Sequence, residues 1–261
     1  MTKIPTVMSI AGSDSGGGAG IQADIKTIAA NGVYGTTVIT AVTAQNTMGV
    51  IDVQEMSIEL VESQINAIMA DIGADAVKTG MLSSAEMILC VSKKIQEYGI
   101  GKFVLDPVMV ATSGDSLLKE DAVESIKRLL IPLCSIVTPN GPEAKELTGI
   151  NVRDLDSARD AAIELVNMGA GAAVVKGGHL DGPATDVLYD GDEVRLFTTK
   201  RIDSPNTHGT GCTFASAIAC GLALNKSLRE SVSVAKAYVT GGIRNGLNLG
   251  DGHGPLNHFH K

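Results

Sequence analysis

Three polar side chains that could handle phosphate chemistry stand just past the ends of short apolar runs. Asp106, Asn140 and Lys176 each lie within three residues of such a run. In open α/β sheets, ligands bind beyond the carboxyl ends of the strands, so residues in these places are the first candidates for a site. The pattern would put a carboxylate, an amide and an ammonium along one rim of a sheet.

Asp106, Asn140 and Glu143 form a set of oxygen-bearing side chains. Magnesium takes oxygen ligands and keeps several waters, so these groups could hold it directly or through water, while Lys176 could meet phosphates. The competing interpretation is that Asp106 and Asn140 cap the helices that follow, for which Asp and Asn are preferred. For either residue taken alone, the cap is favoured.

A glycine-bearing turn precedes a long apolar segment near the carboxyl terminus. Residues 207–213 read Thr-His-Gly-Thr-Gly-Cys-Thr, and a helical pattern starts within them. Gly209, Thr210 and Gly211 would point backbone N–H groups at an anion, and the positive end of the helix dipole favours negative charge there. A tight strand-to-helix connection is the alternative, and the turn gains weight only beside the rim residues. His208 could touch phosphate or serve the structure of the turn.

Cys212 is the one cysteine whose neighbours suggest chemistry. It stands in the first turn of the expected helix, where the pKa of a thiol is commonly lowered, so its thiolate could act as a base. Most single cysteines are structural, but the phosphate-binding turn beside Cys212 favours chemistry. The remaining cysteines form no C-x-x-C pair and sit among apolar residues, as core cysteines of a reduced compartment do: Cys90, Cys134 and Cys220.

A second glycine cluster, residues 12–20, follows the first apolar run of the chain. It contains neither the G-x-x-x-x-G-K-[ST] run of a phosphate-binding loop nor the G-x-G-x-x-G spacing of a dinucleotide-binding loop. We therefore expect Gly12 and its neighbours to let the backbone approach a second substrate, with Asp24 on the following helix as a polar contact. A flexible connecting loop is the alternative, because glycine favours that as well.

Apolar runs and helical spacings alternate along the chain, which predicts a mainly parallel sheet covered by helices. Strands are expected at residues 6–11, 37–42, 76–78, 102–105, 136–138 and 172–176, and helices around 21–28 and at 58–72, 155–168, 210–222 and 228–244. Residues 186–189 and 194–198 flank Asp-Gly-Asp, a hairpin signal that predicts an antiparallel edge. No linker or repeat divides the chain, so one domain is expected over residues 1–261.

Composition and charge exclude several classes of protein. The 261 residues are 44% hydrophobic with 30 Gly and no Trp, which suits a buried sheet-and-helix core. A formal net charge of -8 provides no basic surface for a nucleic acid or an anionic membrane. No apolar run approaches the roughly 20 residues that span a bilayer, and the amino terminus lacks the apolar stretch of a secretory signal. A cytoplasmic protein is expected.

Eight ordered motifs cover nearly the whole chain. They are AGSD at residues 11–14, GGAGIQAD at 17–24, TAQNT at 43–47, KTGM at 78–81, DPVM at 106–109, TPN at 138–140 with Glu143, KGGH at 176–179 and HGTGCT at 208–213, followed by a GHGP tail at 252–255. This set resembles the hydroxymethylpyrimidine and phosphomethylpyrimidine kinases, the thiamin-biosynthetic branch of the ribokinase-like superfamily.

The resemblance implies a ribokinase-like three-layer α/β/α sandwich that works as a homodimer. It also implies two successive transfers from ATP with Mg²⁺, first to the hydroxymethyl group of 4-amino-5-hydroxymethyl-2-methylpyrimidine and then to the monophosphate formed. The expected partners are therefore a small pyrimidine, ATP and Mg²⁺, with no nucleic acid and no membrane.

By motif position, the resemblance gives each candidate residue a role. The implied pyrimidine contacts are Gly12, Asp24, Gln45 and Met81. The implied metal ligands are Asp106 and Glu143, and the implied nucleotide and phosphate contacts are Lys176, Asn140, Thr207 and His208. The implied anion hole and base are Gly209, Thr210, Gly211 and Cys212. The amide of Gln45 can both donate and accept, which complements an aminopyrimidine edge, unless it only satisfies loop backbone.

Cysteine at position 212 is what the pyrimidine branch shows, whereas sugar kinases of the superfamily carry aspartate there. The first transfer must deprotonate an alcohol, but the second attacks with a phosphate oxygen that is already ionised near neutral pH. Loss of Cys212 is therefore expected to slow the first transfer more than the second.

Three other functions stay open. A kinase for pyridoxal, pyridoxine or pyridoxamine would use a similar small hydroxymethyl ring. A non-catalytic ligand-binding regulator would have no need of the intact candidate residues, and a nicotinamide-dependent oxidoreductase would carry the dinucleotide fingerprint that the chain lacks. The histidines near the carboxyl terminus are expected in a solvated tail rather than in a metal cluster: His253, His258 and His260.

Overall fold

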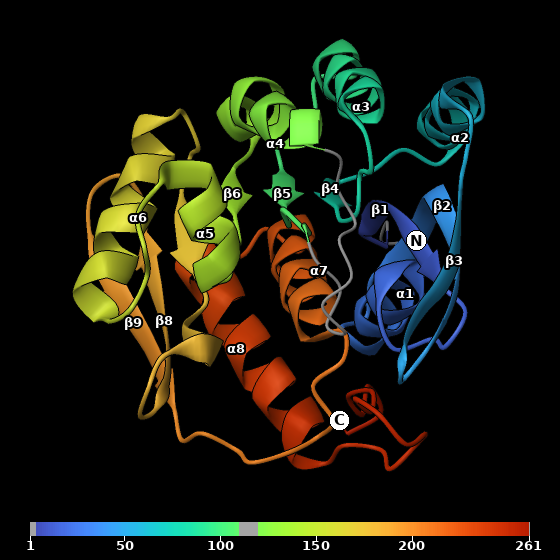
Figure 1. Cartoon of the computed structure of the whole chain (residues 1–261). Helices are drawn as coiled ribbons and strands as arrows, with labels where there is room; N and C mark the ends of the chain where they lie inside the picture. The colour runs from blue at the N-terminus through green and yellow to red at the C-terminus, as the bar shows by residue number, and fades with distance from the viewer. Residues whose placement is uncertain (1–3, 110–119, 261) are drawn as a thin grey trace.

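The computed structural model describes residues 4–109 and 120–260. A nine-stranded sheet runs through the molecule in the order β3-β2-β1-β4-β5-β6-β7-β8-β9 (Figure 1). Its strands are β1 (Thr6–Asp14), β2 (Tyr34–Asn46), β3 (Gly49–Glu55), β4 (Ala76–Thr79), β5 (Phe103–Leu105), β6 (Ile136–Val137), β7 (Ala173–Val175), β8 (Ala184–Tyr189) and β9 (Val194–Thr199). The six predicted strands of the parallel part are all present, with shifted ends.

The middle of the sheet is parallel and both edges are antiparallel. Strands β2, β1, β4, β5, β6 and β7 pair in parallel, whereas β8 and β9 form the predicted antiparallel hairpin at one edge. Strand β3 adds a second antiparallel edge beside β2, which the sequence did not predict. Its residues are exposed or half-buried throughout, so no alternation of buried and exposed positions marks it as a strand.

The α-helices are α1 (Gly20–Ala30), α2 (Ile58–Asp71), α3 (Ala85–Glu97), α4 (Glu120–Ser125), α5 (Gly141–Thr148), α6 (Leu155–Asn167), α7 (Thr210–Ala223) and α8 (Leu228–Arg244). The predictions for α2, α6, α7 and α8 are confirmed to within one residue at each end. Local chemistry sets several of the starts: α5, α6 and α8 each begin with a reciprocal capping box, in which the cap and the third helical residue satisfy each other's backbone N–H.

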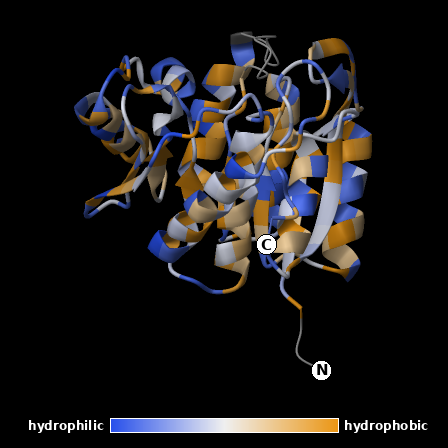
Figure 2. Cartoon of the chain, turned by 90° about the horizontal axis from the view of Figure 1, so that it is seen from below, coloured by the Kyte–Doolittle hydropathy of each residue, from blue (hydrophilic) through white to orange (hydrophobic). Residues whose placement is uncertain are grey.

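Two hydrophobic cores lie on opposite faces of the sheet, because successive strand residues point to opposite sides. Val7 and Val104 join the core beneath α1, α7 and α8, while their neighbours Met8 and Leu105 join the core beneath α2 to α6. Figure 1 shows these two groups of helices on either side of the sheet, and Figure 2 shows hydrophobic and hydrophilic residues on the same helices, as packing against a sheet requires. The predicted three-layer α/β/α architecture is confirmed.

Within the described ranges, no helix is both long enough and apolar enough to cross a lipid bilayer.

Candidate active site

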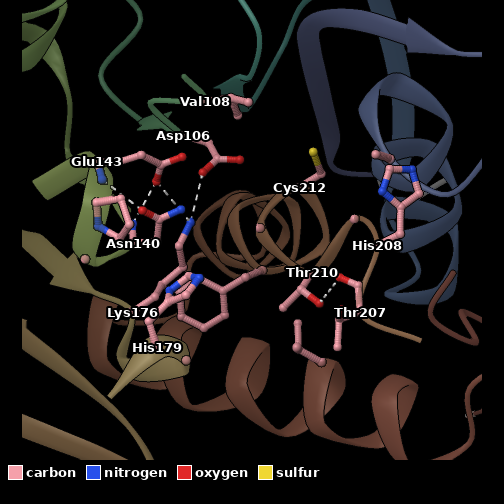
Figure 3. Close-up of a pocket in the computed structure, with 18 of the residues that line it drawn as sticks. Asp106, Val108, Asn140, Glu143, Lys176, His179, Thr207, His208, Thr210 and Cys212 are labelled. Carbon is pink, nitrogen blue, oxygen red and sulfur yellow. Dashed lines mark hydrogen bonds and ion pairs between the residues drawn. The ribbon is translucent and has the colours of Figure 1, made fainter. Parts of the chain in front are cut away.

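A cavity of about 1100 Å³ opens beyond the carboxyl ends of the central strands. Its walls come from distant parts of the chain, including the loop after β1, the residues that follow β5, β6 and β7, and the start of α7. Every predicted site residue except Asp24 lines it: Gly12, Gln45, Met81, Asp106, Asn140, Glu143, Lys176, Thr207, His208, Gly209, Thr210, Gly211 and Cys212. Figure 3 shows most of them around the opening.

The three predicted rim residues meet in a charged cluster at one side of the cavity. Lys176 Nζ lies 3.3 Å from Asp106 Oδ1 and 3.9 Å from Glu143 Oε2, and Figure 3 shows the lysine amine directed at both carboxylates. Residues 140 and 176 also pair through their backbones as an isolated parallel bridge. The prediction that these strand ends share one rim is confirmed.

Asn140 and Glu143 owe their positions to the capping box of α5. The Asn140 side chain accepts a hydrogen bond from the Glu143 N–H at 2.9 Å, and Glu143 Oε2 accepts one from the Asn140 N–H at 2.7 Å. The interpretation of Asn140 as a helix cap is thus confirmed. Its amide side chain and the Glu143 carboxylate are nevertheless held at the cavity wall.

Asp106 differs, because it follows β5 without capping a helix in the described part of the chain. Its Oδ1 accepts a hydrogen bond from the Thr138 hydroxyl at 3.2 Å, whereas its buried Oδ2 has no hydrogen-bond partner among the described residues. A buried carboxylate oxygen without a partner is costly. An oxygen-seeking cation such as Mg²⁺ would supply that partner, so the donor chemistry fits the metal.

No group of three or more His, Cys, Asp and Glu side chains in the described residues is arranged to hold a metal ion. Two carboxylates are enough for magnesium, which usually takes one or two from the protein and keeps waters and substrate phosphates as its other ligands. Asp106 and Glu143 therefore fit a metal that arrives with a phosphate ligand.

Burial and charge oppose each other in this cluster. Burial raises the pKa of Glu143 to about 7, although the Lys176 ammonium acts to lower it. Burial alone would lower the pKa of Lys176, but the charges of Asp106 and Glu143 hold that pKa above its ordinary value. Lys176 therefore stays cationic at neutral pH and is suited to meet phosphate oxygens.

The glycine-bearing turn at the start of α7 lies next to this cluster. Gly209 adopts φ +80°, and a Cβ there would overlap the carbonyl oxygen of Gly18, so only glycine fits. The Thr210 hydroxyl donates to the Thr207 carbonyl at 2.7 Å and fixes the turn from inside. A Cβ on Gly211 would stand 3.4 Å from Lys176 Nζ. The first N–H groups of α7, which lack partners within the helix, therefore begin beside the lysine.

His208 is tied to the first glycine cluster rather than left free at the cavity. Its Nε2 lies 2.9 Å from Asp14 Oδ2 in a buried contact. The Asp14 carboxylate also accepts N–H groups of Gly16, Gly18 and Ala19 at 2.8–3.0 Å. Asp14 is a site residue whose role the sequence analysis missed, although it lies inside a quoted motif; nothing in the sequence shows that residues 14 and 208 meet.

Cys212 lies half-buried at the cavity wall, but its acidity corrects the prediction. Burial raises the pKa of Cys212 to about 12, although the positive charge of Lys78 and a backbone hydrogen bond from Gly20 act to lower it. The lowered pKa expected at a helix start is therefore wrong for this thiol, because loss of water outweighs the helix end.

Asp24 is not a substrate contact, which corrects a second prediction. Its side chain has no exposed surface and does not line the cavity. Its carboxylate accepts hydrogen bonds from Ser9 at 2.5 Å, Ser216 at 2.7 Å and Lys78 at 3.0 Å. All four side chains are buried, so Asp24 takes part in a buried hydrogen-bond network rather than in the wall of the cavity.

The other predicted pyrimidine contacts gather at one end of the cavity. A Cβ on Gly12 would stand 3.2 Å from Met81 Sδ, so the bare backbone of residue 12 and the thioether share one surface. Gln45 Oε1 lies 3.1 Å from the Thr43 hydroxyl, and its Nε2 lies 3.5 Å from His208 Nε2. A flat ring with a polar edge would find an apolar floor and an amide here.

The cavity also has a mainly apolar wall that the sequence analysis missed. Val239, Thr240 and Ile243 of α8 line it, together with Ile202 and Val152. Their helical spacing signals a buried face, but the sequence alone cannot separate a face that packs on protein from one that faces a ligand. The apolar side chains of this wall suit contact with an aromatic ring.

Comparison with known proteins gives three findings. The family model described as phosphomethylpyrimidine kinase matches residues 14–257. The chain is 49% identical to the hydroxymethylpyrimidine/phosphomethylpyrimidine kinase of Bacillus subtilis over 98% of this chain and 96% of that protein. It is 51% identical to the thiamine biosynthesis bifunctional protein ThiED of Geobacter sulfurreducens over 97% of this chain, but it spans only 52% of that longer protein.

A solved structure is also closely similar. An ADP complex of Bacillus subtilis pyridoxal kinase superposes with a TM-score of 0.92 at 35% identity, covering 98% of each chain.

Proposed function

We propose that this chain, which belongs to the phosphomethylpyrimidine kinase family, phosphorylates 4-amino-5-hydroxymethyl-2-methylpyrimidine and then its monophosphate in thiamin biosynthesis, using ATP. One observation carries the proposal within the structure: Lys176, paired with Asp106, stands beside Gly211 in the anion-binding turn of α7. Phosphoryl transfer relies on positioning and on neutralising charge. This juxtaposition supplies both at one point of the cavity.

The arrangement of the walls supports a binding direction. The pyrimidine lies at the end formed by Gly12, Gln45 and Met81, and the nucleotide base lies against the α8 wall. The transferred phosphate then lies between them, where Lys176 and the N–H groups of Gly211 and Cys212 can bind its oxygens, since the Thr210 N–H already donates to the Thr207 carbonyl. Thr207, His208 and Asn140 border the same region.

Mg²⁺ is the proposed metal, held by Asp106 and Glu143 with water and phosphate oxygens as further ligands. The Oδ2 atom of Asp106, which has no hydrogen-bond partner among residues 4–109 and 120–260, supports this assignment. The metal would supply neutralisation of phosphate charge. Lys176 keeps the two carboxylates together before the nucleotide arrives.

Cys212 is the proposed base for the first transfer. The proton of the hydroxymethyl group passes to the Cys212 thiolate while the alcohol oxygen bonds to the terminal phosphorus and the bond to ADP breaks. Because the pKa of Cys212 is raised to about 12, little thiolate exists at neutral pH, and the first transfer should speed up as pH rises. The second transfer needs no base, because its phosphate nucleophile is already ionised.

A pyridoxal kinase is the second candidate function. The TM-score of 0.92 to a pyridoxal kinase favours it, and its substrate would fit the same apolar floor. The greater identity to the pyrimidine kinases over the full chain supports the main proposal.

The deciding experiment is product analysis by mass spectrometry with magnesium and ATP. The protein is incubated separately with the hydroxymethylpyrimidine, its monophosphate and pyridoxal. We expect mono- and diphosphorylated pyrimidine. Pyridoxal phosphate as the sole product would replace the proposal with the second candidate, and transfer to none of the three would contradict both.

We also propose that the enzyme is a cytoplasmic homodimer that binds neither nucleic acid nor membrane. The acidic net charge of -8 supports the lack of polyanionic partners. Met48, Ile51 and Val53 on and beside the edge strand β3 expose apolar side chains, which a second copy could cover. Light scattering of the wild type and of Ile51→Glu tests this: the wild type should have twice the monomer mass, and the variant should shift toward monomer.

A further inference from the structure

The carboxyl-terminal tail, residues 250–260, packs against the body of the protein instead of being solvated as expected. Burial alternates along it, since Gly254, Leu256 and His258 are buried while their neighbours are half-buried or exposed. Leu256 belongs to the hydrophobic core beneath α7 and α8. In Figure 1 the tail reaches back from the end of α8 toward α1. The tail is thus a packed part of the fold on the side of the sheet covered by α7 and α8.

The tail is anchored to α8 by two hydrogen bonds. The Asn257 N–H donates to the Gly242 carbonyl at 3.1 Å, and the Tyr238 hydroxyl donates to the His258 carbonyl at 3.0 Å. Tyr238 is itself buried in the core. The tail therefore has a fixed base from which it can position other segments.

Three segments of the site are fastened to this base. The His208 N–H donates to the Gly254 carbonyl at 3.1 Å, directly before the anion-binding turn. Pro255 contacts the first glycine cluster, because a Cβ on Gly18 would stand 3.3 Å from it. The His253 N–H donates to the Thr47 carbonyl at 2.9 Å. Thr47 follows the end of β2, two residues after Gln45.

His258 contacts helix α7 directly. Its Nε2 lies 3.1 Å from the Thr213 hydroxyl, and both side chains are buried. Thr213 follows Cys212, and its N–H donates to the Gly209 carbonyl at 2.9 Å, which closes the first turn of α7. Through Thr213, the imidazole of His258 therefore holds the first turn of α7. This turn contains both the proposed anion-binding N–H groups and the proposed base.

We propose that the tail is a positioning element of the active site, with His258 as a positioning residue that sets the first turn of α7 relative to Gln45. The inference rests on the proposed kinase function. His258 touches no substrate; it acts through Thr213 and the turn. A misplacement of about 1 Å between reacting groups can cost about 100-fold in rate, so loss of this contact should lower kcat while leaving the KM for ATP nearly unchanged.

The test compares His258→Leu with His260→Leu, a control in the same tail whose ring packs on Tyr238 and Gly241. We expect kcat for pyrimidine phosphorylation to fall by about 10- to 100-fold in His258→Leu and by less than about twofold in the control. His258→Gln, which can still hydrogen-bond Thr213, should restore most of the rate. An equal loss in both leucine variants, or no rescue by glutamine, would overturn the proposal.

A double-mutant cycle separates the contact from general packing. Thr213→Val removes only the hydroxyl partner, so Thr213→Val should slow the enzyme as His258→Leu does, and the double variant should be no slower than either single variant. Losses that multiply would show two independent effects and contradict the proposed coupling.

Hydrogen exchange measured by mass spectrometry keeps the inference distinct from the kinase proposal. Exchange of the amides in residues 207–214 should accelerate in His258→Leu but not in His260→Leu. If the wild type transferred no phosphate to any tested substrate, the kinase proposal would fail while this measurement still decided whether the tail fixes the turn. Unchanged exchange in His258→Leu would reject the positioning role. Should His258→Leu fail to fold, Thr213→Val carries the same comparison.

Discussion

Lys78 Nζ lies 3.0 Å from both carboxylate oxygens of Asp24, and neither side chain has any exposed surface. Ser216, which also bonds Asp24, stands one helical turn after Cys212 on the same face of α7. Burial alone would lower the pKa of Lys78, but the charge of Asp24 holds it above its ordinary value. Lys78 therefore keeps its positive charge at neutral pH, and its contact with Asp24 ties β4 to α1, which Ser216 joins to α7.

Breaking this pair on one side should be far more costly than neutralising both sides. Lys78→Met leaves the Asp24 carboxylate buried without its cation, and we expect a loss of about 3–5 kcal/mol in the free energy of unfolding. The double variant Asp24→Asn, Lys78→Met keeps polar contacts to Ser9 and Ser216, so it should recover most of that loss. Urea unfolding measures each value.

The matched control for the buried pair is an exposed one. Arg159 pairs with Asp156 at 3.2 Å on the surface of α6, so Arg159→Met should change the unfolding free energy by less than about 1 kcal/mol. A double variant as unstable as Lys78→Met alone would show that lost packing, rather than an unpaired charge, explains the effect.

Gly209→Ala should disable the anion-binding turn. The added methyl group meets the Gly18 carbonyl and strains a backbone at φ +80°, so the first N–H groups of α7 must move. Removing one oxyanion donor costs about 100- to 1000-fold in kcat in other enzymes, and we expect a loss of that order. Steady-state kinetics with the hydroxymethylpyrimidine measures it.

Gly191→Ala is the control, because it strains the backbone without pushing any neighbouring atom aside. Gly191 has φ +91° in the turn between β8 and β9, and no atom of the described residues lies within 4 Å of the place that an added methyl group would take. The variant should lose about 1–2 kcal/mol of stability and keep its turnover. Equal kinetic losses in the two variants would mean that strain, and not the position of the anion-binding groups, governs the rate.

The raised pKa of Cys212 predicts how fast the thiol reacts with iodoacetamide. Only the thiolate attacks, so below a pKa of about 12 the rate should rise by about tenfold for each pH unit. Peptide mapping after timed alkylation from pH 7 to pH 10 measures the rate, and Cys212→Ser identifies the labelled site. A rate that levels off near pH 7 would show a lowered pKa instead.

Loss of the proposed base should separate the two transfers. Cys212→Ala removes the acceptor for the alcohol proton, so the first transfer should slow by about 100-fold or more, within the usual range for general bases, while the second changes little. In the wild type, the first transfer should accelerate between pH 7 and pH 9. Equal slowing of both transfers in Cys212→Ala would assign the thiol a structural role.

The sequence was sufficient for features that depend on strand order alone. Asp106, Asn140 and Lys176 were predicted to meet because parallel strands end at one edge, and Lys176 does lie 3.3 Å from Asp106. The hairpin of β8 and β9 followed from its turn residues. Such inferences need the direction of each strand but no knowledge of side-chain packing.

Features that depend on burial were out of reach. Asp24 stands on an ordinary-looking helix, and only the fold shows that it faces Lys78, which is 54 residues away. The same limit explains Cys212: its place at a helix start was correctly predicted, but the surrounding protein that raises its pKa was not. His258 belongs to this group too, because a short polar tail gives no sign that it will be buried.

Protonation of His258 should weaken the fold in mild acid. Burial lowers its pKa to about 4, compared with about 6.5 in an unfolded chain. Between these values the unfolded chain binds a proton that the folded protein excludes, so the stabilisation is complete above about pH 6.5 and is lost as the pH falls. At pH 5 this one residue should account for about 2 kcal/mol of lost stability.

Urea unfolding at pH 7.5 and pH 5 should therefore show a smaller acid effect in His258→Gln than in the wild type. His253→Gln, which alters an exposed histidine of the same tail, should behave as the wild type does. Identical acid sensitivity in all three proteins would mean that His258 titrates normally and that the tail opens readily in solution.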